Sequence, residues 1–514
     1  MKLTPPYYPI IYVRGYAGSD REIEDTVATP FMGFNLGATK ARQLWDGKVV
    51  RHYFESPLVR LMKDHEYRDV FVDGEELPPD VDPYPRLVFI YRYYDEASSE
   101  LGPGQRSEIE HYANGLSGLI VKIRARMCSS AAEKQAFRVY LVAHSMGGLI
   151  CRCFLQNAAC GSDEARQCVD KVFTYATPHN GIDLSVIGNL PAFFTRNNAD
   201  NFNRERMRSY LGLPQDTPLE DVASLNGKFD PNRFFCLVGT NDRDYDVAAG
   251  WARRVVGPMS DGLVRIANAT VHGPGQSGKA QAPRAFVYRS HSGHYGIVNS
   301  EDGYQNLTRF LFGNVRVDGV LEVQELTLPP KVQVDYAQGK TIRASYHFEV
   351  VVRVRGARWD LHRRTVQEGS AIFRTFDEML RPGPAGPRRP YLFSTFLHSK
   401  ARVNTRRSSL GFSVDLGVQA PQYEVDNALW FDQHYEGGYL YRDKINLEAI
   451  PPAGDLPHWR LKVGFDLRTP NRTTQYVDAV QDGGRLVFRI PVSQNTRPGM
   501  KGELVLYATP WNTA

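Results

Sequence analysis

Residues 139–150, Val-Tyr-Leu-Val-Ala-His-Ser-Met-Gly-Gly-Leu-Ile, place a serine between two apolar runs. The first run predicts a buried strand, and the second has the spacing of a helix. The turn between them has the form Ala-x-Ser-x-Gly, in which small residues let the backbone fold sharply and hold the Ser145 hydroxyl out. The first amides of the helix, Met146 among them, would point toward an oxyanion formed on a carbonyl attacked by that serine. This stretch predicts acyl-transfer chemistry at Ser145; the alternative is an ordinary strand-to-helix turn.

Ala-His-Ser-Met-Gly-Gly resembles the nucleophile elbow of the α/β-hydrolase lipases, including bacterial lipases that have Ala in place of the first Gly of the motif. The resemblance covers about the first 315 residues and implies an α/β-hydrolase fold. It also implies a catalytic triad whose members follow the chain order Ser, acid, His.

The length and composition predict two domains. A chain of 514 residues with 42% hydrophobic residues exceeds one ordinary domain and can build more than one core. We expect an α/β catalytic domain over residues 1–314 and an antiparallel β-sandwich over residues 315–514. The net charge of +5 is small for this length, so it predicts no general affinity for nucleic acid.

The cysteines and the N-terminus favour a reduced compartment. The six cysteines lack Cys-x-x-Cys spacing with histidines, so no zinc site is predicted and buried thiols are expected. The first predicted strand begins within a few residues of Met1, which leaves no room for a signal peptide. No apolar run reaches the roughly 20 residues that span a bilayer. We therefore expect a cytoplasmic protein, or one exported without a leader.

Strands and helices alternate along the first half. Apolar strands are predicted at residues 9–13, 87–94, 139–144, 171–176 and 233–240, with a crossover helix before the serine strand and a closing helix over residues 301–312. This rhythm is typical of a mainly parallel sheet. Residues 34–82 show weaker periodicity, and there we expect surface helices around Arg42 and from Leu58 to Met62.

The first strand leads into Arg14-Gly15-Tyr16-Ala17-Gly18. In the lipases that the chain resembles, this loop begins His-Gly, and the residue after that glycine supplies a backbone amide to the oxyanion hole. The resemblance assigns this role to Tyr16. Arg14 stands where those lipases have histidine, a departure that changes what stabilises the loop; the alternative is a plain glycine turn.

Two carboxylates and two histidines compete to complete the triad. Asp261, in Asp-Gly-Leu-Val, resembles the segment with the catalytic aspartate of several bacterial lipases, and Asp242 directly after a strand is the alternative. Gly293-His294-Tyr295-Gly296-Ile297 resembles the segment around the catalytic histidine of small bacterial lipases, and His291 is the competitor. We choose Asp261 over Asp242 and His294 over His291.

The segment after the next strand bears on the substrate pocket. Thr177-Pro178-His179-Asn180-Gly181 resembles a lipase segment in which His179 would support the pocket or a loop rather than act as base. Residues 182–226 depart from the strand and helix rhythm, with an apolar patch followed by polar residues. They are expected to form a lid over an acyl pocket or, equally, a peripheral helical subdomain.

The second half consists of short alternating segments separated by Gly and Pro, which predicts the β-sandwich. Between Arg353 and Arg407 there are 13 Lys or Arg residues against four Asp or Glu residues. Such a surface could attract anionic lipid headgroups. The alternative is a solvated sheet face or a surface that docks on the first domain.

The sequence predicts a serine hydrolase of carboxylic esters, with a lipid-like substrate and no cofactor or metal. A phospholipase, thioesterase or acyltransferase would use the same residues. A hydrolase fold without turnover, in which the β-sandwich binds a partner, is the alternative from another class.

Overall fold

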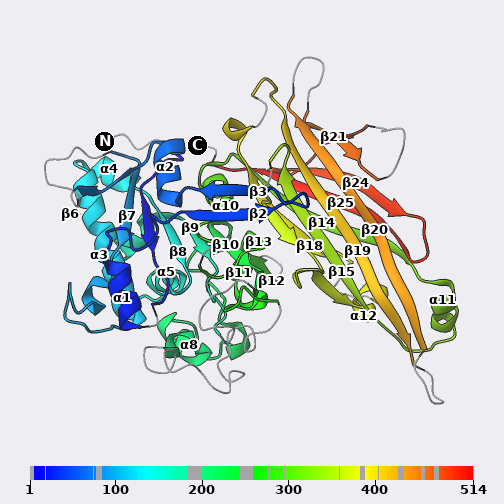
Figure 1. Ribbon diagram of the computed structural model, residues 1–514, viewed down its shortest axis with the longest axis horizontal. Helices are drawn as coiled ribbons and strands as arrows, with labels where there is room; N and C mark the ends of the chain where they lie inside the picture. The colour runs from blue at the N-terminus through cyan, green and yellow to red at the C-terminus, as the bar shows by residue number, and fades with distance from the viewer. Residues whose placement is uncertain are drawn as a thin grey trace. The chain divides into compact units, whose positions relative to one another are not determined.

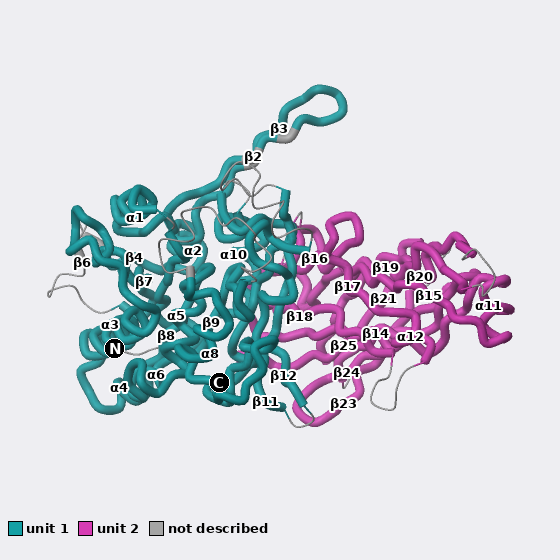
Figure 2. The backbone as a smooth tube through the Cα atoms, turned by 90° about the horizontal axis from the view of Figure 1, so that it is seen from below, with its two compact units in different colours: residues 1–312, 514 teal, residues 313–513 magenta. Residues whose placement is uncertain are grey.

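The computed structural model describes residues 5–17, 19–72, 75–76, 84–182, 199–243, 259–275, 278–293, 296–357, 359–381, 388–402, 405–426, 433–452, 458–467 and 474–512. The chain divides into two compact units, unit 1 with residues 1–312 and 514, and unit 2 with residues 313–513 (Figure 2).

Unit 1 is built on a seven-stranded parallel sheet (Figure 1). Its strands lie in the order β13 (Arg284–Val287), β10 (Phe234–Gly239), β9 (Val169–Tyr175), β8 (Val139–His144), β1 (Ile10–Val13), β7 (Leu87–Tyr91) and β4 (Arg68–Asp69). Strands β1 and β10 are apolar and buried along their whole length, and β8 is so up to His144 at its end, as expected of a sheet with helices on both faces. The serine strand β8 pairs with β1 and β9 at the middle of the sheet.

Helices connect these strands. They are α1 (Asp20–Val27), α2 (Pro57–His65), α3 (Ile109–Met127), α4 (Ala131–Ala136), α5 (Met146–Gln156), α6 (Asp163–Cys168), α8 (Arg204–Tyr210) and α10 (Glu301–Phe312). Helix α3 buries the apolar positions that recur at helical spacing, and it packs against α5. Helix α10 packs on β9, β10 and β13. Short two-stranded pairs are β5 (Phe71–Val72) with β6 (Glu75–Glu76), and β11 (His272–Gly275) with β12 (Gly278–Gln281).

The prediction of a helix around Arg42 is wrong. Residues there form a hairpin of β2 (Ala38–Gln43) and β3 (Val49–Phe54), whereas α2 forms over the other expected helix. The Leu44 N–H donates to the Lys48 carbonyl (2.8 Å), which closes the connection, and Gly47 adopts φ +82°. A glycine in the left-handed region ends such three-residue hairpin loops. The Asp46-Gly47 pair was the sequence signal for this turn.

A lysine lies in the core of unit 1. Lys171 on β9 has a side chain only 5% exposed, and its Nζ lies 3.2 Å from Asp170 Oδ2 and 3.5 Å from both Tyr140 Oη and the Leu311 carbonyl. Burial lowers the pKa of Lys171 to about 8, although Asp170 acts in the opposite direction.

This buried lysine predicts a pH-dependent stability. The pKa is about 8 in the folded protein and about 10.4 in an unfolded chain, so between these values the unfolded state binds more protons. The free energy of unfolding should therefore rise with pH over this window, by up to about 3 kcal/mol relative to a Lys171→Met variant. Urea unfolding of both proteins from pH 7 to 10 measures this difference. Lys122→Met, at an exposed position of α3, is the control, and parallel pH curves for wild type and Lys171→Met would contradict the prediction.

Unit 2 is an antiparallel β-sandwich. One sheet has the order β18 (Tyr391–Leu397), β14 (Val315–Thr327), β25 (Gly499–Pro510), β24 (Arg485–Gln494) and β23 (Val480–Asp482). The other has the order β16 (His362–Arg364), β15 (Ile342–Val354), β19 (Leu410–Val425), β20 (Gln433–Ile450), β21 (Arg460–Phe465) and β22 (Gln475–Asp478), with β17 (Ile372–Thr375) also on β15. Helices α11 (Pro330–Ala337) and α12 (Phe376–Leu380) complete the unit. A single apolar core contains inward residues of both sheets, among them Leu504 and Phe348.

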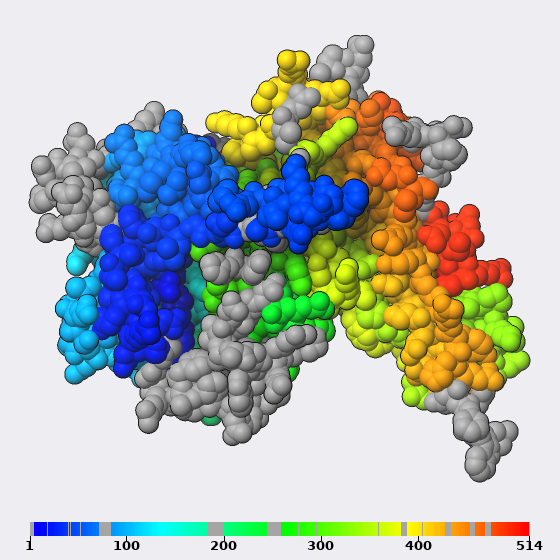
Figure 3. Space-filling view, in the orientation of Figure 1, coloured from blue at the N-terminus to red at the C-terminus, as the bar shows by residue number. Residues whose placement is uncertain are grey.

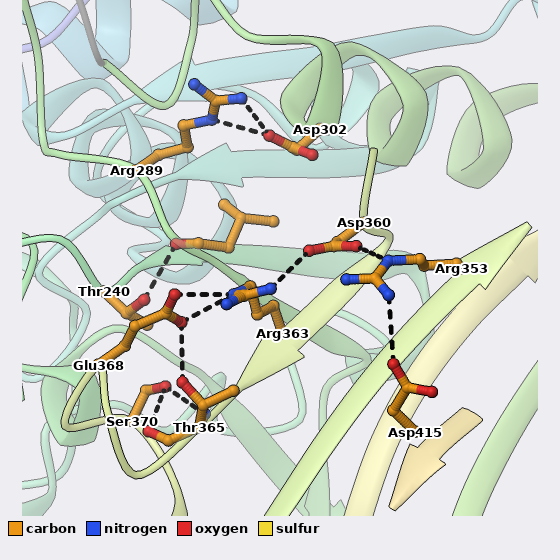
Figure 4. A network of polar contacts seen from close by, with 11 residues as sticks. Thr240, Arg289, Asp302, Arg353, Asp360, Arg363, Thr365, Glu368, Ser370 and Asp415 are labelled. Atoms are coloured by element: carbon orange, nitrogen blue, oxygen red, sulfur yellow. Dashed lines mark hydrogen bonds and ion pairs between the residues drawn. The ribbon is translucent and has the colours of Figure 1, made fainter. Parts of the chain in front are cut away.

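The arginines at the start of the basic stretch are ion-paired within unit 2 (Figure 4). Arg353 contacts Asp360 and, at 3.2 Å, Asp415. Arg363 lies 2.8 Å from Glu368 and 3.3 Å from Asp360. These partners neutralise part of the charge excess that the sequence shows between Arg353 and Arg407.

The predicted fold class is confirmed: a mostly parallel α/β sheet with helices is followed by an antiparallel β-sandwich. All six cysteines are buried free thiols, as expected. Among the described residues, no helix combines the length and apolar character needed to cross a membrane.

Candidate active site

Ser145 occupies the turn between β8 and α5 in a strained conformation. Its backbone has φ +51° and ψ −123°, which is rare for a residue with a side chain. The Ser145 N–H donates to the Tyr175 carbonyl on β9 (2.9 Å), and the Ser145 carbonyl accepts from Thr177 Oγ1 (2.9 Å). These two bonds hold the turn on the neighbouring strand, so the conformation persists despite its cost.

Two glycines let other segments approach this turn. A Cβ added to Gly147 would lie 2.4 Å from the Val13 carbonyl oxygen, so the first turn of α5 can reach the end of β1 only because Gly147 has no side chain. A Cβ added to Gly15 would lie 2.8 Å from Ser145 Cβ. The loop after β1 therefore rests directly against the serine.

His291 joins Ser145 to a carboxylate. Its Nε2 lies 2.9 Å from Ser145 Oγ, and its Nδ1 lies 2.9 Å from Asp261 Oδ2. Because the carboxylate can only accept, Nδ1 carries the proton and Nε2 is free to accept from the serine hydroxyl. All three side chains are almost completely buried.

The choice of His294 over His291 therefore has no support from the geometry. His294 lies outside the described residues, and His291, the competitor, occupies the position between the serine and the acid. The His291 N–H donates to the Asp261 carbonyl (3.0 Å), so the backbone also holds these two residues together.

Asp261 is held by a network of its own. Its Oδ1 accepts from the N–H groups of Leu263 (3.0 Å) and Val264 (2.7 Å), which leaves Oδ2 for His291. A Cβ added to Gly239, the last residue of β10, would lie 2.7 Å from Asp261 Cβ. The segment with Asp261 thus packs on the end of β10, where Gly239 leaves room for it.

The other candidates lie elsewhere. Asp242 follows β10 and is half-buried, and it is not the carboxylate bonded to His291. His179 is fully buried, with Nε2 3.0 Å from Thr174 Oγ1, and burial, with a smaller effect of the Arg152 charge, holds its pKa well below the usual range. The His179 carbonyl accepts from Arg152 (2.6 Å), so this residue bonds the segment after β9 to helix α5.

Sequence reasoning missed His144, the residue before the serine. Its ring is 5.0 Å from that of His291, and its Nε2 donates to the His291 carbonyl (3.0 Å). Burial, together with the nearby His291 and Arg14, holds the pKa of His144 well below the usual range, so the ring stays neutral. His144 therefore ties the elbow to the loop that carries His291. The continuous apolar run of β8 contained no signal for this bond.

Arg14 has a structural partner that explains the departure from histidine. Its Nη1 donates to the Met32 carbonyl (2.7 Å), and a Cβ on Gly33 would lie 2.8 Å from the same nitrogen. Arg14 thereby anchors the loop after β1 to the turn at Met32 and Gly33.

Two buried tyrosines after β7 orient the backbone of this loop. The Tyr93 hydroxyl donates to the carbonyls of Arg14 (2.9 Å) and Gly15 (3.2 Å), and the Ala17 N–H donates to Tyr94 Oη (2.7 Å). The C=O and N–H of a trans peptide point in opposite directions. The bond from Tyr93 to the Gly15 carbonyl therefore turns the Tyr16 N–H away from Tyr93.

Part of the expected lid lies outside the described residues, namely 183–198. Residues 199–226 form two short 3-10 helices, Ala199–Phe202 and Leu219–Asp221, on either side of α8. Arg152 on α5 donates to the carbonyls of Val222 (2.8 Å) and Ser224 (2.9 Å), and burial lowers its pKa to about 10. Phe202 meets the ring of Tyr16 edge-on at 5.8 Å. This part of the segment packs within unit 1 and brings an aromatic side chain to the loop after β1.

Among the described residues, no cluster of three or more His, Cys, Asp or Glu side chains has the geometry to hold a metal ion.

Parts of the chain are similar to a known family and to solved structures. The family model of the PGAP1-like alpha/beta domain matches residues 99–226, which include β8, the serine turn and β9. None of the curated proteins matches the chain. The product of the lin2722 gene of Listeria innocua is 13% identical, with a TM-score of 0.28, over 59% of this chain and 94% of that one. The BlEst2 lipase of Bacillus licheniformis in its propeptide form is 11% identical, with a TM-score of 0.29, over 89% of this chain and 96% of that one.

At these identities and superposition scores, neither structure bears on the activity of this chain. The family match covers a minor part of the sequence, but that part contains the serine strand β8, the serine turn and β9. Together with the seven-stranded parallel sheet, it supports an α/β-hydrolase fold for unit 1.

Proposed function

We propose that the protein is a serine hydrolase of carboxylic esters with Ser145 as nucleophile, His291 as general base and Asp261 as the acid that orients His291. The observation that carries this proposal is the unbroken chain of hydrogen bonds from Ser145 Oγ through both ring nitrogens of His291 to Asp261. Such an arrangement activates a serine hydroxyl, which is otherwise a weak nucleophile. His291 thus replaces His294 as the proposed base, and Asp242 is not required.

In the first step, Ser145 Oγ attacks the ester carbonyl while its proton passes to His291 Nε2. The imidazolium formed is stabilised by Asp261, and it then gives the proton to the leaving alkoxide, which departs as an alcohol. Water attacks the resulting acyl-enzyme with His291 again as base, which releases the carboxylic acid and restores the serine. No step requires a redox group.

We assign the oxyanion hole to the backbone amides of Met146 and Tyr16. Met146 begins α5, whose N-terminal amides face the elbow. Support for Tyr16 comes from the close approach of Gly15 to Ser145 and from the orientation that the Tyr93 bond imposes on this peptide.

Tyr93→Phe should test this assignment, because it removes only the hydroxyl that bonds the carbonyls of Arg14 and Gly15 in this loop. We expect kcat to fall about tenfold with little change in KM, less than the loss of about 100-fold or more when an oxyanion donor itself is removed. Affinity for a trifluoromethyl ketone, which mimics the tetrahedral intermediate, should fall in parallel. Tyr67→Phe is the matched control, since Tyr67 Oη donates to the Tyr8 carbonyl (2.8 Å) away from this loop. Equal losses in both variants would indicate a general packing effect.

We propose a lipid-like ester as the substrate class. The partly exposed ring of Tyr16, which packs edge-on against the buried Phe202, gives the loop beside the serine an apolar surface, which suits an acyl chain. Hydrolysis rates of nitrophenyl esters of increasing chain length, measured beside phospholipid and thioester release, separate a lipase from a phospholipase or thioesterase. The direct test of the activity is a fluorophosphonate probe, which should label Ser145, and absence of labelling in the folded protein would contradict the proposal.

A further inference from the structure

The hairpin of β2 and β3 projects from unit 1 (Figure 2). Its two strands pair with each other in a sheet of their own. The two strands come close together at the base, where a Cβ on Gly37 would lie 2.5 Å from the Phe54 carbonyl oxygen. Ser56, directly after the hairpin, caps α2 and so fixes the base to unit 1. The tip is therefore presented on an arm with an anchored base.

One face of this arm is exposed along its length. Cross-strand partners share a face, and the pairs are Thr39 with Tyr53, Ala41 with Arg51, and Gln43 with Val49. All six residues are exposed, Tyr53 by 73% and Val49 by 55%. Trp45 at the tip is 99% exposed. Figure 3 shows the hairpin in blue on the molecular surface.

The charged residues of the arm are mostly basic. Residues 38–54 contain four Lys or Arg residues and a single acidic residue, Asp46. Asp46 is engaged in the turn, where its Oδ1 accepts from the Lys48 N–H (3.0 Å). Lys48 beside the tip and Arg51 on the exposed face are both open to solvent.

The exposed aromatic residues and the basic charge of the arm favour an anionic lipid surface over a second copy of the arm. Two copies of the same arm would bring like charges together, which disfavours pairing of hairpin with hairpin. Anionic lipid headgroups are complementary to the basic side chains. Trp and Tyr are the residues that prefer the boundary between headgroups and acyl chains, because each combines an apolar ring with a polar group.

We propose that the β2–β3 hairpin is a membrane-binding arm, in which Trp45 and Tyr53 enter the headgroup region of an anionic bilayer and Lys48 and Arg51 contact the phosphates. The arm holds the hydrolase unit at a lipid surface. This proposal is independent of the triad, because binding requires no turnover.

The test is co-flotation of the full chain carrying Ser145→Ala with phosphatidylcholine vesicles, with and without phosphatidylglycerol. The Ser145→Ala background prevents any hydrolysis of the lipid, so failure to bind and failure to catalyse are measured separately. We expect binding to vesicles with phosphatidylglycerol and a decrease with added salt. Lys48→Gln with Arg51→Gln should weaken binding about 25-fold, since each basic residue near the surface contributes about fivefold.

Trp45 gives a second and independent readout. Trp45→Ser should weaken binding about tenfold, as expected for loss of a partly buried aromatic side chain. Vesicle binding should shift the fluorescence of Trp45 to the blue, whereas the five other tryptophans of the chain should stay unshifted. Trp45→Phe should therefore retain most of the binding but lose this blue shift. Tyr476→Ser is the control, because Tyr476 is an exposed aromatic residue of unit 2 (56%).

Three results would overturn the proposal. The first is absence of vesicle binding by the Ser145→Ala chain. The second is binding that survives the hairpin variants but is lost when basic residues between Arg353 and Arg407 are replaced. The third is a concentration-dependent dimer, measured by sedimentation, that Trp45→Ser abolishes while vesicle binding persists.

Discussion

Replacement of His291 by alanine should reduce kcat/KM for a soluble nitrophenyl ester by about 10⁵- to 10⁶-fold, and Ser145→Ala should do the same. The effects are similar because the two side chains act as a unit: without His291 Nε2 the hydroxyl 2.9 Å away keeps its proton, and without the hydroxyl the base has nothing to activate. The double variant should be no slower than either single variant. Steady-state rates with each purified protein, checked for folding by circular dichroism, measure this.

His294→Ala is the decisive control for the identity of the base. If His291 accepts the proton, His294→Ala should retain kcat/KM within about tenfold, since it removes neither of the observed bonds to Ser145 and Asp261. The reverse result, a severe loss in His294→Ala and near-normal turnover in His291→Ala, would show that the arrangement observed around Ser145 is not the reactive one.

Asp261→Asn should lower kcat about 10⁴-fold. The backbone N–H groups of Leu263 and Val264 both donate to Oδ1, so the carbonyl oxygen of the new amide must take that place. Its NH₂ group then faces His291 Nδ1, which has to accept instead of donate. The proton of the imidazole moves to Nε2, where it blocks acceptance of the proton from Ser145.

Asp242→Asn is the matched control for this variant, since it makes the same chemical change at the other carboxylate considered from sequence. It should leave kcat within about threefold, because Asp242 is not the carboxylate bonded to His291. Equal activity of Asp261→Asn and wild type would remove Asp261 from the proposed mechanism.

The hydrophobic pattern of the sequence predicts most of the strands and helices of the fold. Continuous apolar runs such as Ile10–Val13 and Val139–His144 predict strands buried on both faces, and they form the centre of the parallel sheet. A local sequence pattern does not predict the secondary structure where both a helix and a hairpin are compatible with it. The weak periodicity around Arg42 predicts a surface helix, but these residues form a hairpin, for which the turn at Asp46 and Gly47 is the stronger signal.

The sequence alone predicts the serine and its turn, because a strained elbow needs small residues at particular spacings and those residues are neighbours along the chain. The identity of the proposed base was not, because His291 and His294 are three residues apart in one loop and both fit the order of the triad. What distinguishes them is distance to Ser145, and that depends on how the loop after β13 is held by the Asp261 carbonyl and by His144. Contacts between segments more than 100 residues apart arise from packing, and a linear pattern of residue types does not encode them.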